Sequence, residues 1–105
     1  MKKTNIIAQQ VEELKNQIDN KNKNKYLVQI GHDNIQDHQY THAEVQAEII
    51  DSLQYELKEL HDNEELEIPT LRGLIDKLQH NGECTLLSVY DLGENELDLC
   101  EFFKV

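Results

Sequence analysis

Apolar residues recur at helical spacing in three stretches of the chain, and the first stretch covers residues 4–19. Its apolar positions step by four, three and four residues, through Ile7, Val11, Leu14 and Ile18. Thr4 is suited to cap the start of this helix. The spacing fits a helix docked on the core or a short coiled-coil seam between two copies. Because the stripe lasts barely two heptads, we favour the docked helix.

The second stretch predicts a helix over residues 42–61. Thr41 and Glu44 match the capping box, in which two side chains satisfy two free amides at the helix start. The apolar face of this helix contains Val45, Ile49, Leu53, Leu57 and Leu60, with Ile50 beside them. Residues 62–68 then form an acidic loop. A third helix follows. Pro69 is suited to its start, and Asn81-Gly82 provides a stop signal at its end. Its apolar positions are Leu71, Leu74, Ile75 and Leu78.

Alternating patterns predict three strands, over residues 26–31, 84–90 and 96–104. Residues 32–40 between them are polar and irregular. In the first strand Tyr26, Val28 and Ile30 share a face, and in the second Leu87 and Val89 point inward. The last two strands form a C-terminal β-hairpin with Asp91 opposite Glu96. Along the last strand the inward face holds Leu97, Leu99, Phe103 and Val105, whereas Phe102 points the other way.

The element order α-β-α-α-β-β predicts an α+β fold. We expect three helices packed on a small, mainly antiparallel, three-stranded sheet that ends in the hairpin. The 105 residues are enough for a single domain, 1–105, with a basic Asn/Lys connector at 20–25 between the first helix and the first strand.

Charge changes the functional picture, because the net charge is −11 and is unevenly spread. Residues 1–25 hold six lysines against three acids, a net of +3, while residues 26–105 hold four basic residues against 18 acids, a net of −14. A body this acidic would repel a phosphate backbone, so we expect no direct nucleic-acid binding. No apolar run is long enough to cross a membrane, and Ile6-Ile7-Ala8 is too short for a signal peptide. We therefore expect a cytoplasmic protein.

Carboxylates gather on one face of the central helix. At about 100° per residue, Glu44, Glu48, Asp51, Tyr55, Glu59 and Asp62 fall within a sector of about 80°, opposite the apolar face. They span roughly 27 Å along the helix axis. Further acids that could join this surface are Glu64 and Glu65 in the acidic loop and Asp91, Glu94 and Glu96 around the hairpin tip. These eleven residues are the predicted partner-binding site, because a carboxylate row with a tyrosine can imitate a strand of phosphates.

Two other groups of residues could carry chemistry. Residues 32–42 hold His32, His38 and His42 with Asp33 and Asp37, which are possible metal ligands or a base with its orienting acid. The spacing matches no structural zinc pattern and no nucleophile motif stands nearby, so we predict no metal, no cofactor and no enzyme. Cys84 and Cys100 would lie about three residues out of register on the hairpin, so we expect reduced thiols.

These patterns favour a small, non-enzymatic, acidic binding protein. It would dock on the basic groove of a nucleic-acid-handling protein and compete with DNA or RNA. Counter-defence proteins of mobile elements, which inhibit nucleases or RNA-guided effectors, have the sort of role that fits. The alternative is a structural or regulatory interaction module, which could form a homodimer through helix 4–19 and use its acids only for solubility. A second alternative is a metal-dependent enzyme built on the cluster from His32 to His42.

Overall fold

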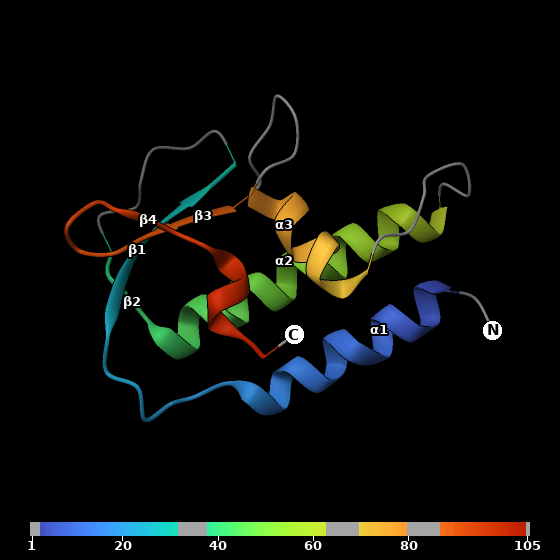
Figure 1. Ribbon diagram of the computed structural model, residues 1–105, viewed down its shortest axis with the longest axis horizontal. Helices are drawn as coiled ribbons and strands as arrows, with labels where there is room; N and C mark the ends of the chain where they lie inside the picture. The colour runs from blue at the N-terminus through green and yellow to red at the C-terminus, as the bar shows by residue number, and fades with distance from the viewer. Residues whose placement is uncertain (1–2, 32–37, 63–69, 80–86, 105) are drawn as a thin grey trace.

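The computed structural model describes residues 3–31, 38–62, 70–79 and 87–104, and their side chains except at 3–5 and 60–62. Within these residues the fold is α+β, with three helices and a four-stranded antiparallel sheet. In Figure 1 the strands gather at one end, α2 (His42–Asp62) runs away from them, and α1 (Lys3–Leu14) lies along one side. The third helix, α3, covers Leu71–Gln79.

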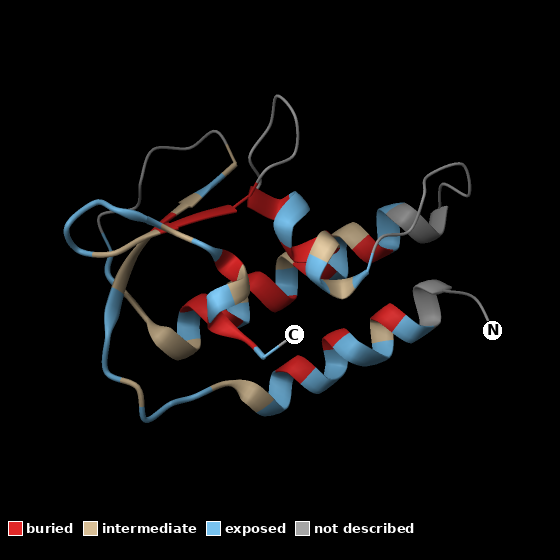
Figure 2. Cartoon of the chain, in the orientation of Figure 1, coloured by how far each residue is buried: buried red, intermediate tan, exposed pale blue. Residues whose placement is uncertain are grey.

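The first helix is shorter than predicted. It begins at Lys3, so Thr4 is not its cap, and after Leu14 only one 3₁₀ turn, η1 (Lys15–Gln17), continues it. The chain then becomes extended at Ile18, and the N–H of Asp19 donates to Oε1 of Gln46 instead of to a helix carbonyl. The stripe itself is buried at Ile7, Val11 and Leu14 on the side facing the rest of the molecule (Figure 2), which confirms the core-docked helix.

The capping box that starts α2 is confirmed. The N–H of Thr41 donates to Oε1 of Glu44 at 3.0 Å, and the N–H of Glu44 donates to Oγ1 of Thr41 at 3.1 Å. In α3 the cap is Thr70, whose Oγ1 accepts from the N–H of Gly73 at 3.1 Å. This cap is a local signal in the sequence, but the predicted helix start rested on Pro69 instead. Pro69 and Asn81-Gly82 lie outside the described residues.

The sheet has the strand order β2-β1-β3-β4, formed by β2 (Tyr40–Thr41), β1 (Lys25–Ile30), β3 (Leu87–Tyr90) and β4 (Glu96–Leu97). Every neighbouring pair is antiparallel. The predicted antiparallel sheet with a C-terminal hairpin is confirmed in β1, β3 and β4, and the structure adds a fourth strand to it. The added strand, β2, is two residues long, and so short a segment cannot show the alternation that identifies a strand.

The predicted strand 96–104 is also wrong beyond its second residue. After β4 the chain forms a 3₁₀ helix, η2 (Leu99–Phe102), and the carboxylate of Asp98 accepts from the N–H of Cys100 to start it. A 3₁₀ helix has three residues per turn, so positions i and i+3 share a face. Leu99 and Phe102 are consequently both buried, although strict alternation would place them on opposite faces.

Two buried glutamines hold this C-terminal segment. Gln79 on α3 donates to the carbonyl of Leu97 at 2.7 Å and accepts from the N–H of Leu99. Gln46 on α2 donates to the carbonyl of Phe102 at 2.9 Å. These amides bind backbone groups that a continuing strand would have paired in a ladder, so the segment can leave the sheet without losing all of its hydrogen bonds.

The hairpin register differs from the prediction by one residue, because Tyr90 rather than Asp91 lies opposite Glu96. In the turn, the N–H of Glu94 donates to the carbonyl of Asp91, and the N–H of Asp91 donates to the carbonyl of Asn95. Glu94 adopts a left-handed conformation with φ 64°. This conformation suits glycine, since a Cβ atom crowds the following carbonyl oxygen there.

Replacing Glu94 with glycine is therefore expected to stabilise the protein. The gain should be about 0.5–1 kcal/mol, because relief of the left-handed strain exceeds the extra flexibility of glycine in the unfolded chain. Urea unfolding of the variant and the wild type measures this difference. A glycine at Leu92, where the structure records no positive φ, should not stabilise, and a loss of stability in Glu94→Gly would contradict the strain argument.

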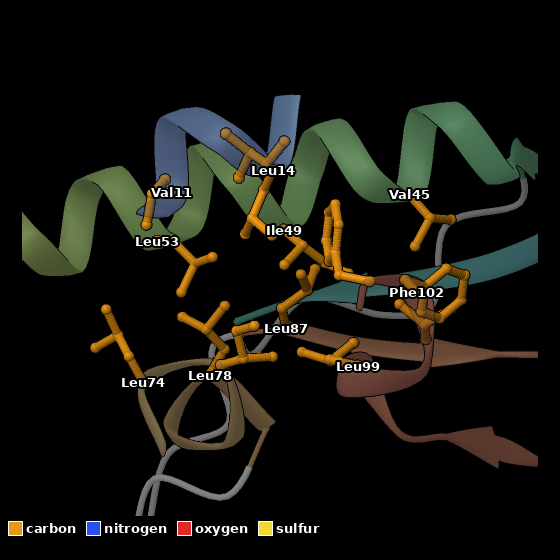
Figure 3. Close-up of a cluster of buried hydrophobic side chains, with 14 of the residues drawn as sticks. Val11, Leu14, Val45, Ile49, Leu53, Leu74, Leu78, Leu87, Leu99 and Phe102 are labelled. Carbon is orange, nitrogen blue, oxygen red and sulfur yellow. The ribbon is translucent and has the colours of Figure 1, made fainter. Parts of the chain in front are cut away.

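The hydrophobic core lies where all these elements meet. Figure 3 shows side chains from α1 (Val11, Leu14), α2 (Ile49, Leu53) and α3 (Leu74, Leu78) pointing toward one another, with Leu99 and Phe102 closing the side near the sheet. The described core comprises Ile7, Val11, Leu14, Val28, Val45, Ile49, Ile50, Leu53, Leu57, Leu74, Ile75, Leu78, Leu87, Val89, Leu99, Phe102 and Phe103. Ile30, which was predicted to share a strand face with the buried Val28, is 39% exposed.

Candidate functional site

The candidate site is the solvent-facing side of α2. Burial of Val45, Ile49, Leu53 and Leu57 in the core fixes the rotation of the helix, so the opposite side faces outward. Glu44, Asp51, Tyr55 and Glu59 are exposed on that side, and Glu48 is half-buried. The distance along the axis from Glu44 to Glu59 is about 22 Å at about 1.5 Å per residue. We call these five residues the α2 row.

Glu44 is the member of the row that is most engaged within the chain. Its carboxylate accepts from the N–H of Thr41, and its Oε2 lies 3.7 Å from Nε2 of His38. The backbone and hydroxyl hydrogen bonds with Thr41, followed by the contact with His38, lower the pKa of Glu44. Its first role is to cap α2, and it therefore has less freedom to contact a partner than the rest of the row.

Glu48 lies where the row meets the body of the protein. Burial raises the pKa of Glu48, and the negative charge of Asp51, three residues along the helix, raises it further. The folded protein therefore holds the Glu48 proton more tightly than the unfolded chain does. A cation brought to this side would reverse the effect, since it favours the charged carboxylate.

This pKa shift predicts that Glu48→Gln stabilises the protein at neutral pH. The raised pKa means that stability falls as pH rises through it, and glutamine removes that loss. The gain at pH 7 should be a few tenths of a kcal/mol, the usual size for a like-charge pair on an exposed helix face. It should vanish near pH 3, where the carboxyl is protonated in both states. Urea unfolding at pH 7 and pH 3 measures this gain in stability. Glu13→Gln, on the exposed side of α1, is the control. An equal gain at the two pH values would contradict the raised pKa of Glu48.

Apart from Glu44, the carboxylates of the row form no ion pair with the basic side chains that the structure describes. Among the described residues, the ion pairs are Lys15 with Glu12 and His38 with Glu44. Neither involves Glu48, Asp51 or Glu59. Lys58 is exposed near the edge of the same face without forming an ion pair in this part of the chain. Within the described part of the chain, Glu48, Asp51 and Glu59 thus present unpaired negative charge on this side of α2.

Tyr55 places an aromatic ring within the row. Its side chain is 62% exposed, and it lies one helical turn from Asp51 and one from Glu59. Within the described residues its ring packs on no other aromatic ring, and its hydroxyl makes no hydrogen bond. An exposed tyrosine of this kind can stack on a planar group such as an arginine guanidinium of a partner.

The hairpin acids do not join the α2 row. The carboxylate of Asp91 is used inside the turn, where it accepts from the N–H groups of Gly93 and Asn95. These bonds lower the pKa of Asp91, with the Asn95 N–H as the largest cause. Glu94 and Glu96 are exposed, but β4 and the strand that leads into α2 are opposite edges of the sheet. Three strand spacings separate those edges by roughly 14 Å.

Other residues of the predicted site are not part of the described structure. Glu64 and Glu65 lie outside the described residues, and so does the side chain of Asp62. Among the described residues, the candidate site is therefore the α2 row.

The histidine cluster is described only in part, because His32, Asp33 and Asp37 lie outside the described residues. The ring of His38 is exposed and meets Tyr40 edge to face at 5.0 Å. The ring of His42 instead packs against both Tyr26 and Phe102, with centroids 6.0 and 5.2 Å away. No group of three metal-ligating side chains comes together among the residues that are described.

Cys100 lies in η2 and not on a strand of the hairpin, as was predicted. Cys84 is outside the described residues. The Cys100 thiol is half-buried and donates weakly to the carbonyl of Arg72, with Sγ 3.9 Å from the oxygen. Burial, and next the charge of Asp98, raises the pKa of this thiol. A raised pKa keeps the thiol protonated and makes it a poor nucleophile.

A groove with a volume of about 670 Å³ lies away from the α2 row. Residues 17–21, the first turn of α2 and the C-terminal segment line it, and Lys21, His42, Gln46 and Lys104 are among the lining residues. Sequence patterns could not show this groove, because its walls come from three distant parts of the chain. Nδ1 of His42 is buried and has no hydrogen-bond partner.

Membrane-spanning segments and similarity to known proteins were the two remaining sources of functional information. None of the described helices combines the length and apolar character needed to span a bilayer. Comparison of the chain with protein-family models, with curated proteins and with solved structures finds no match.

Proposed function

We propose that this protein is a small, acidic, non-enzymatic inhibitor that docks its α2 row on a basic groove of a nucleic-acid-handling protein. The observation that carries the proposal is the carboxylate face of α2, with Tyr55 exposed within it. The row would occupy arginine and lysine side chains that otherwise hold phosphates, through charge-assisted hydrogen bonds. DNA or RNA could not then enter the groove.

The charge of the whole chain supports a protein partner rather than nucleic acid. The region from residue 26 to the C-terminus has four basic against 18 acidic residues, a net charge of −14. Such a surface repels phosphates and is attracted to basic clefts, which raises the rate of encounter with them. We propose that this encounter takes place in the cytoplasm, as part of counter-defence by a mobile element.

The linear charge density of the row sets how the inhibitor must work. Four carboxylates over about 22 Å give roughly one charge per 7 Å, against one per about 3.4 Å for each DNA strand. Charge alone would therefore not outcompete a nucleic acid strand. Binding must gain from shape and stacking as well, and Tyr55 is the described residue on this face that can supply both.

The proposal predicts that reversing the row abolishes partner binding. Glu48→Lys, Asp51→Lys and Glu59→Lys together place three cations against a cationic groove, while the buried side of α2 is unchanged. The immobilised chain should capture proteins from a host lysate that elute in a salt gradient and are released by added DNA or RNA. The triple variant should capture none of them. Circular dichroism checks that it is folded.

Two double variants distinguish the effect of the row on binding from the effect of net charge. The first double variant, in the row, is Asp51→Lys with Glu59→Lys. The second, outside the row, is Glu13→Lys with Glu101→Lys. The two change the net charge equally, and all four residues are exposed. The first pair should weaken binding to a captured protein at least roughly 100-fold, as loss of close interfacial charge pairs does, and the second should have little effect. Equal affinities for the two pairs would refute the proposal.

Salt distinguishes this function from an interaction module that uses its acids only for solubility. Docking through the row should weaken steeply with ionic strength, whereas apolar docking should not. The stripe of α1, which could have formed a dimer seam, is already buried within the chain. An interaction unaffected by salt would favour the module.

A further inference from the structure

We draw no further inference here: the strongest candidate, the groove between residues 17–21, the first turn of α2 and the C-terminal segment, carries nothing because the unpartnered Nδ1 of His42 is closed off from solvent, Lys21 and Lys104 are matched by Asp19 and Glu101 on the same walls, and nothing in the structure shows what covers it.

Discussion

Replacing Gln46 with alanine is expected to lower the free energy of unfolding by about 2–4 kcal/mol, the cost of leaving several buried or half-buried polar groups without partners. Gln46 is only 1% exposed. Its Oε1 accepts from the N–H of Asp19 at 2.8 Å, and its Nε2 donates to the carbonyls of Gln17 and Phe102. One side chain on α2 thus joins the end of η1 to the end of η2.

Urea unfolding followed by circular dichroism measures this loss. Gln54→Ala is the matched control, since Gln54 is an exposed glutamine on the same helix with one hydrogen bond, to Glu12. Gln46→Met fills a similar volume without the amide, so it should remain destabilised if the hydrogen bonds matter. Wild-type stability in Gln46→Met would show that Gln46 acts by volume alone.

Leu53→Ala is expected to destabilise the protein by about 3 kcal/mol, within the usual range for a buried leucine. Leu53 is fully buried at the centre of α2, and Figure 3 shows it among side chains from α1 and α3. Because these elements come from three parts of the chain, they cannot easily collapse into the space left by the lost methyl groups. Much of the cavity should therefore remain.

Thermal and urea unfolding test this prediction against Tyr55→Ala, two residues along the same helix. Tyr55 is largely exposed, so its truncation should change stability by less than about 0.5 kcal/mol. The two variants together also test the rotation of α2, on which the orientation of the row depends. Similar losses in both would contradict the assignment of buried and exposed faces.

Most of the candidate site could be predicted from the sequence, because it lies on one long helix. Once the capping box set the start of α2, the spacing of 3.6 residues per turn placed Asp51, Tyr55 and Glu59 opposite the apolar face. Spacing could not show whether each carboxylate is exposed and without an intramolecular hydrogen bond. The half-burial of Glu48 and the use of Asp91 inside its own turn depend on neighbours in space.

The amino-acid sequence by itself determined the α+β class, the three helices, the apolar faces and the acidic row, since each follows from local periodicity or from a cap within four residues. The tertiary structure decided where the C-terminal segment goes. Alternation predicted a strand through Lys104, but the buried amides of Gln79 and Gln46 supply hydrogen bonds from other elements, and the chain turns into η2. A polar residue on a buried face gives no periodic signal of its own, because its partners are backbone groups far away in the chain.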